Sequence, residues 1–140
     1  MKTRKREAWE DACLGVLRIV FGFLFLQYGL QKMFHIPPAE HPLPPMTPMT
    51  KMWFAAVIEL IGGSMIILGI FTRFAAFIAS GEMAIAYFEA HASKAPWYWP
   101  LQSNGIPAVA FCFVFLYFVF AGGGAFSLDR LIFKKKPSLA

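Results

Sequence analysis

Charged residues are scarce in this chain, which excludes an ordinary soluble domain. Only 15% of its 140 residues are charged, whereas 58% are hydrophobic and 17% are aromatic. A soluble domain carries about 25% charged residues, because they cover its water-exposed surface. The composition therefore predicts that lipid solvates most of the chain, and the length predicts one domain over residues 1–140.

Cysteine is equally scarce, and no C-x-x-C motif accompanies Cys13 and Cys112. In the helices predicted below, these two residues lie about 20 Å apart in depth. A disulfide needs Cα atoms within about 7 Å of each other, so a bridge is not expected. The sequence also lacks a hydrolase triad, a phosphate loop, an H-E-x-x-H zinc helix and a facing pair of haem ligands. No cofactor is evident from these motifs.

Four apolar segments each have close to the length of a membrane span. They cover residues 12–34, 52–71, 74–91 and 106–124, and about 20 helical residues cross the hydrocarbon of a bilayer. The third segment is the shortest and the most polar. The pattern predicts an all-α fold: an integral membrane four-helix bundle, with a short C-terminal interfacial helix over residues 126–133.

The basic residues predict the orientation of these spans. With four crossings, the two chain ends and the turn after the second span share one side. That side holds nine Lys or Arg and the other side holds three, so both termini are predicted to be cytoplasmic. The nine are Lys2, Arg4, Lys5, Arg6, Arg73, Arg130, Lys134, Lys135 and Lys136. Because the terminal clusters belong to no soluble fold, they predict contact with anionic lipid and not with nucleic acid.

The connections between the spans also carry signals. Residues 35–51 contain six prolines, which favour an extended loop over a helix. In the second outer connection, the run 97–99 is Trp-Tyr-Trp, and these side chains prefer the headgroup layer. The short turn at Thr72-Arg73 predicts that the second and third helices are antiparallel neighbours. Asn104 is placed to cap the fourth helix, with Pro107 in its first turn.

Ionisable residues within a span are costly and are functional candidates. The four in the predicted spans are Arg18, Glu59, Glu82 and Glu89. At about 100° per residue, each shares a helix face with glycine or alanine, as Arg18 does with the stripe of Gly15, Gly22 and Gly29. Small residues mark close packing of membrane helices, so these charges are expected to point between helices and not at lipid.

Depth along the spans predicts which charges meet. Counted from the inner boundary at 1.5 Å per residue, Arg18 lies about 9 Å deep and Glu82 about 12 Å deep. We therefore predict an intramembrane ion pair between them, which would neutralise both charges. The alternative to a functional role is that the pair only fixes the register of the helices.

Glu59 lies about 18 Å from the inner boundary, farther out than Arg18 and deeper than Lys32, so no basic partner is expected for it. Other polar side chains lie at or beyond its level. We predict an outward-facing pocket that binds a polar head group or relays protons. Its candidate residues are Glu59, Glu89, Gln27, Gln31 and His91. The alternative is that Glu59 sets helix packing, while Glu89 and His91 are solvated helix ends.

The outer loop contains the spacing M-x-x-M-x-x-M, formed by Met46, Met49 and Met52, with His35 and His41 nearby. Thioether and imidazole ligands suit Cu(I). Methionine is also common near membrane surfaces, so these residues are weak candidates and no metal site is predicted.

Several short motifs follow one another along the chain. The first span carries Arg18 and Gly22 and then Gly29-Leu-Gln-Lys32. The second carries Glu59-Leu-Ile-Gly62-Gly63 and ends in Gly69-Ile-Phe-Thr72-Arg73. Later come Asn104-Gly105 and Gly122-Gly123-Gly124-Ala-Phe-Ser127-Leu-Asp129. This order, over roughly residues 14–129, resembles the DoxX family of small bacterial and archaeal membrane proteins. Ile106 departs from the family pattern, in which a second glycine often follows Asn-Gly.

The resemblance implies a four-helix, multi-pass protein of the bacterial or archaeal cytoplasmic (inner) membrane. The family takes its name from a subunit associated with thiosulfate:quinone oxidation, and other members are linked to membrane oxidoreductase and thiol-stress complexes. The leading hypothesis is therefore a quinone-linked or redox-associated subunit. It would lie in the lipid bilayer and associate with a redox partner protein or with further copies of itself.

In this hypothesis Glu59 is the main acceptor and Glu89 a second one, with the Arg18–Glu82 pair as support. Whether the chain is itself an enzyme is left open, because it has no catalytic motif of its own. One alternative is a small proton-coupled transporter that uses the same carboxylates. Another is a structural membrane subunit without a site.

Overall fold

The structure is a computed structural model that describes residues 2–133, so the basic residues Lys134, Lys135 and Lys136 lie outside the described residues. Within this range it contains helices and no strand, which confirms the all-α prediction. The helices are α1 (Lys2–Phe34), α2 (Lys51–Leu68), α3 (Thr72–Ala86), the π-helical turn η1 (Tyr87–His91), α4 (Ile106–Ala121) and α5 (Leu128–Ile132).

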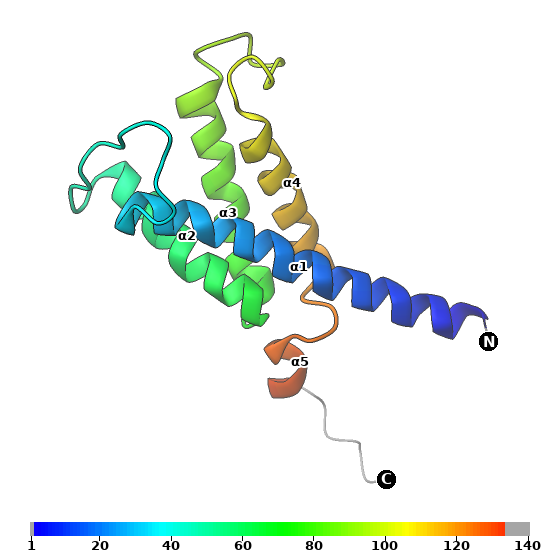
Figure 1. The fold of residues 1–140 in the computed structure, drawn as a ribbon. Helices are drawn as coiled ribbons and strands as arrows, with labels where there is room; N and C mark the ends of the chain where they lie inside the picture. Colours follow the sequence, from blue (N-terminus) through cyan, green and yellow to red (C-terminus); the bar gives the residue numbers. More distant parts are fainter. Residues whose placement is uncertain (1, 134–140) are drawn as a thin grey trace.

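The long helices form two antiparallel pairs (Figure 1). α1 packs along α2 and α3 packs along α4, whereas the contacts of α2 with α3 and of α1 with α4 are less extensive. The two pairs cross each other at a steep angle, with α1 passing the lower ends of α3 and α4 (Figure 1). The four long helices thus form two hairpins that cross and pack against each other.

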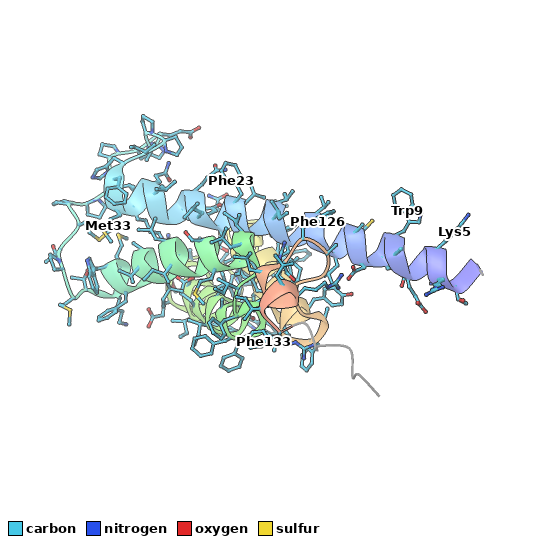
Figure 2. All side chains as sticks on the ribbon, turned by 90° about the horizontal axis from the view of Figure 1, so that it is seen from below. Lys5, Trp9, Phe23, Met33, Phe126 and Phe133 are labelled. Atoms are coloured by element: carbon cyan, nitrogen blue, oxygen red, sulfur yellow. The ribbon has the colours of Figure 1, made fainter. Side chains whose placement is uncertain are left out.

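α1 begins ten residues before the predicted span. Nothing in residues 2–11 breaks a helix, and Arg6 Nε donates to Glu10 Oε1 at 2.7 Å one turn later. This first part of α1 projects beyond the other helices. Lys5 and Trp9 lie on this projecting part (Figures 1 and 2). Sequence hydropathy located the apolar part of the helix and missed its polar extension.

Glycine and left-handed backbone set the other helix ends. α2 ends at Leu68, three residues early, because Gly69 adopts φ 70°. α4 ends at Ala121, since Gly122 adopts φ 79°. At its start, the predicted cap is wrong: Asn104 has φ 55° and Gly105 occupies the N-cap position without a side-chain bond. The proline-rich loop is non-helical, as predicted, up to Thr50, whose Oγ1 caps α2 by accepting from Trp53 N.

Aromatic rings fill the space between the two hairpins. Phe25 of α1 contacts Phe111 and Phe115 of α4, with ring centroids 5.7 and 4.8 Å apart. The small residues Ala75, Ala76 and Ala79 of α3 complete this core. Outside it, large apolar side chains are widely exposed, as is expected where lipid is the solvent.

Within residues 2–133, two helices, Thr3–Phe34 and Lys51–Leu68, are long and apolar enough to cross a membrane, and Ile106–Ala121 is a shorter apolar helix. This judgement rests on their length and composition. It supports membrane helices in the chain.

Candidate functional site

A close approach of α1 and α2 at Gly29 brings Lys32 to Glu59. A Cβ atom on Gly29 would lie 2.9 Å from the backbone nitrogen of Leu60, so only glycine allows this approach. Three residues later on α1, Lys32 Nζ donates to Glu59 Oε1 at 2.6 Å. The Glu59 side chain is 1% exposed and that of Lys32 is 24% exposed. The pair is therefore largely shielded from solvent.

The expectation that Glu59 has no basic partner is therefore wrong. It placed Lys32 by the depth of its backbone, which is near the outer end of α1. The lysine side chain has a long flexible stem that carries its ammonium group away from the backbone. The stem reaches back along the helix to Glu59, whose second oxygen, Oε2, is buried and has no hydrogen-bond partner among residues 2–133.

Glu82 on α3 is the second carboxylate of this region. Its Oε2 atom is also buried and has no hydrogen-bond partner in the described part of the chain. The charges of Glu59 and Lys32 both act on Glu82, which places the three groups in one electrostatic cluster. Ionisable side chains from α1, α2 and α3 therefore lie in one region of the molecule, and Lys32 and Glu82 line the same groove.

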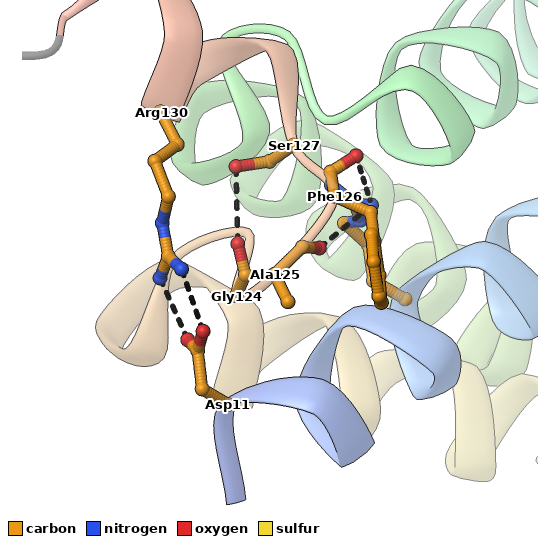
Figure 3. Close-up of polar contacts among 7 residues, drawn as sticks. Asp11, Gly124, Ala125, Phe126, Ser127 and Arg130 are labelled. Atoms are coloured by element: carbon orange, nitrogen blue, oxygen red, sulfur yellow. Dashed lines mark hydrogen bonds and ion pairs between the residues drawn. The ribbon is translucent and has the colours of Figure 1, made fainter. Parts of the chain in front are cut away.

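The predicted Arg18–Glu82 ion pair does not form. Arg18 is fully buried, and its Nη2 donates to the carbonyl oxygens of Phe126 at 3.2 Å and Ala125 at 3.4 Å, two of the bonds that Figure 3 draws. A Cβ on Gly69 would lie 1.8 Å from Arg18 Nη1, so the guanidinium fills the space beside this glycine. The depth count failed because it treated four helices as parallel rods and ignored the segment that returns between α4 and α5.

That returning segment connects motifs that are far apart in the sequence. The Asp129 carboxylate accepts from the backbone N–H groups of Phe71 at 2.7 Å and Thr72 at 2.9 Å. Arg130 donates twice to Asp11, each time at 2.6 Å (Figure 3). Asp11 lies before the predicted span, and its hydrogen bond with Arg130 lowers the pKa of the Asp11 carboxyl. The part of α1 around Asp11, the α2–α3 turn and α5 therefore lie on one side of the molecule.

A groove between α2 and α3 adjoins the Lys32–Glu59–Glu82 cluster. Its cavity volume is about 750 Å³, within the range of about 300–1,000 Å³ typical of ligand pockets. Its walls are mainly apolar, and Lys32 and Glu82 supply polar atoms within it. Lys51 Nζ donates to Glu89 Oε1 at 2.8 Å in the same groove, where both side chains are more than half exposed. The apolar lining residues are Met52, Phe54, Ala55, Ile58, Phe77, Ile78, Ile85, Ala86 and Ala90.

The structure does not gather the predicted pocket residues at one place. Gln27 and Gln31 line a separate cavity of about 460 Å³ between α1 and α4, where Gln31 Nε2 donates to Pro37 O. They are two residues from Gly29, which is about 200° around the helix, so they face away from α2. His91 Nδ1 is 2.8 Å from the carbonyl oxygen of Ser103. Of the predicted pocket residues, Glu89 is the one that lines the same groove as Glu82.

The weak metal candidates lie in different settings. Met46 and Met49 belong to the proline-rich loop, whereas Met52 is in the first turn of α2 and lines the groove. Among residues 2–133, no group of three His, Cys, Asp or Glu is placed to hold a metal ion.

Two residues of these sites were missed as site candidates, Lys32 and Asp129. Both stand in the motifs that carry the family resemblance, Gly29-Leu-Gln-Lys32 and Ser127-Leu-Asp129. Their position next to glycine-rich packing segments was the available signal. Neither lies within the central part of a span, so the search for intramembrane charges passed over them.

Comparisons with known proteins agree with the resemblance. The model of the DoxX family matches residues 13–92, which contain Arg18, Lys32, Glu59 and Glu82. An uncharacterized protein of Haemophilus influenzae is 40% identical over 130 residues, which are 92% of this chain and 97% of that protein. No solved structure matches the chain. The chain therefore belongs to the DoxX family.

Proposed function

We propose that this protein is a quinone-binding subunit of a redox complex in the bacterial cytoplasmic membrane. In this proposal the chain is multi-pass and both termini are cytoplasmic. One observation carries the idea of a ligand: Glu82 lines a largely apolar groove, and its buried Oε2 atom has no hydrogen-bond partner among residues 2–133. Burial of an unpaired polar atom costs free energy, and a ligand that bonds to it would offset that cost.

The chemistry of the groove suits a quinone. A protonated carboxyl donates a hydrogen bond to a quinone carbonyl, and an ionised carboxylate accepts one from a quinol hydroxyl. The ammonium group of Lys32 offers a second donor within the same cavity. The phenylalanine and isoleucine side chains of α2 and α3 are matched to the apolar ring and tail of such a ligand.

Reduction of a quinone to a quinol consumes two electrons and two protons. We assign the electrons to a redox partner protein and the protons to a relay through Glu82 and Glu59. The Lys32–Glu59 pair holds one carboxylate in place, while the nearby Glu82 is free to exchange its proton with the ligand. In this scheme the chain positions the quinone and moves protons, and the partner supplies the electron transfer.

A titration of purified protein with decylubiquinone and with a naphthoquinone tests the proposal, using quenching of tryptophan fluorescence as the signal. Glu82→Leu should weaken binding about tenfold or more, since about 1.4 kcal/mol corresponds to a factor of ten. Glu82→Gln retains a donor and an acceptor, so it should still bind but lose the pH dependence of binding. Glu40→Leu, on the exposed loop, is the control. If neither quinone binds the unaltered protein, the proposal is wrong.

Proton-coupled transport would use the same three ionisable residues. It differs in one requirement, because the groove would have to open alternately to the two sides of the membrane. Proteoliposomes separate the two functions: a transporter accumulates solute in response to a pH gradient without any redox partner, whereas a quinone-binding subunit does not.

A further inference from the structure

A second cavity lies at the opposite side of the molecule from the outer loops. Its volume is about 520 Å³, and it is an open depression lined by the α2–α3 turn, the end of α4 and α5. None of its lining residues belongs to the groove proposed for quinone. Its polar side chains come from Thr72, Arg73, Ser127, Asp129 and Arg130.

Arg73 is the one cation of this cavity that is not committed to a carboxylate within the described residues. Its guanidinium lies over Gly122, where a Cβ atom would be 3.4 Å from Nε. By contrast, Arg130 binds Asp11 through both terminal nitrogens. Asp129 also lines the cavity, but its two oxygens accept backbone N–H groups and its charge faces that of buried Arg18. Three arginines against two aspartates leave this region one positive charge in excess.

Thr72 supplies an independent indication of a ligand. Its side chain is fully buried, and its hydroxyl oxygen has no hydrogen-bond partner in residues 2–133. A Cβ atom on Gly123, which also lines the cavity, would lie 3.1 Å from this hydroxyl and 2.9 Å from Ser127 Cβ, so glycine allows the backbone to pass close to Thr72. A buried hydroxyl without a partner is costly, and an anionic oxygen in the cavity would satisfy it.

The first turn of α3 adds donors at the same place. Phe71 is the N-cap residue, and Asp129 satisfies the N–H groups of Phe71 and Thr72. The N–H groups of Arg73 and Phe74 follow in the first turn, where helices have no internal partner for them. A phosphate group accepts hydrogen bonds from such N–H groups, from a guanidinium and from a hydroxyl.

We propose that this cavity binds a phosphate group, bound by Arg73 and Thr72 and presented by an anionic phospholipid. The rim favours a lipid over free phosphate, because Phe71, Phe74 and Phe133 line the cavity with side chains 55%, 66% and 63% exposed. These rings offer an apolar surface to the glycerol backbone and acyl chains. The site would tie α3 and α5 to the inner leaflet of the membrane.

Native mass spectrometry of the delipidated full chain tests this site. The probes are dioctanoyl phosphatidylglycerol, dioctanoylglycerol (which lacks the phosphate) and inorganic phosphate. We expect the phosphatidylglycerol adduct to exceed the dioctanoylglycerol adduct at least tenfold. Arg73→Gln and Thr72→Val should each reduce it, whereas Arg73→Lys should retain part of it. Arg6→Gln is the matched control, because it removes the same charge from an exposed part of α1.

Equal binding of phosphatidylglycerol and dioctanoylglycerol would overturn the proposal, and so would equal lipid binding by the unaltered protein and Arg73→Gln. Saturable binding of inorganic phosphate that Arg73→Gln abolishes, without preference for the lipid, would support the phosphate site and overturn its assignment to a phospholipid. A melting temperature within a few degrees of that of the unaltered protein shows that a variant is folded. If Arg73→Gln fails this check, Thr72→Val against Thr72→Ser decides in its place.

Discussion

Lys32 Nζ lies 2.6 Å from Glu59 Oε1, and this ion pair joins the C-terminal end of α1 to the middle of α2. Glu59 is fully buried, so its charge depends on Lys32 for compensation. The pair borders Glu82, which has no basic partner of its own at hydrogen-bond distance among the described residues. Glu59 is thus held in an ion pair, whereas Glu82 is available to a ligand. The proposed function depends on this difference.

Removal of Lys32 should destabilise the protein, because it leaves Glu59 buried without compensation. We expect Lys32→Met to lower the free energy of unfolding by about 3 kcal/mol, the lower end for a broken buried pair. Lys32→Met combined with Glu59→Leu should cost less than the sum of the single changes. Unfolding in detergent provides the double-mutant cycle, and strictly additive losses would contradict the pair.

Asp129 should be required for the junction of the α2–α3 turn with α5. Asp129→Asn retains one acceptor oxygen where the carboxylate accepts from both Phe71 N and Thr72 N. Hydrogen bonds to charged groups contribute about 1.5–3 kcal/mol, so we expect a loss of about 2 kcal/mol. Hydrogen exchange of the Phe71 and Thr72 amides should also become faster. The exposed Glu10→Gln change is the control, and unchanged exchange in Asp129→Asn would contradict the role.

The Asp11–Arg130 pair should make stability depend on acid pH. Arg130 lowers the pKa of Asp11 in the folded state. The group therefore stabilises the fold above its unfolded value of 3.8, and this stabilisation is lost as the pH falls toward its lower folded value. Because the pair is partly exposed, the effect should not exceed about 1 kcal/mol. Melting temperatures between pH 7 and pH 3 should fall less in Asp11→Asn than in the unaltered protein, and equal slopes would contradict the pair.

The orientation proposed from the basic residues can be measured directly. A reporter fused after residue 140 should read as cytoplasmic, and one inserted within the loop of residues 35–50 should read as periplasmic, because retained basic residues mark the inner side. A periplasmic C-terminus would reverse the placement of both cavities.

The sequence predicted the helices better than the site, for physical reasons. Hydropathy and glycine spacing are properties of one helix, so they located the apolar segments and the faces of Gly22 and Gly29 that pack on α2. Partner choice depends on helix crossing and side-chain reach. Arg18 was assigned to Glu82 by depth, although the segment after α4 supplies two carbonyl oxygens to it. Lys32 was excluded as a partner of Glu59 because its backbone lies at a different depth, although its side-chain stem reaches Glu59.

The central claim is that a quinone binds in the groove between α2 and α3. Gly81 allows the most direct test of this claim. A Cβ atom on Gly81 meets nothing within 4 Å, and the residue lines the groove, so Gly81→Leu should fill the cavity without disturbing the helix contacts. Gly62→Ala is the matched control, because its Cβ would meet only Phe25 at 3.9 Å, an ordinary contact, and Gly62 does not line the groove. In a decylubiquinone titration, we predict that Gly81→Leu abolishes saturable binding and Gly62→Ala retains it. Binding of equal affinity in Gly81→Leu and in the unaltered protein would contradict the account.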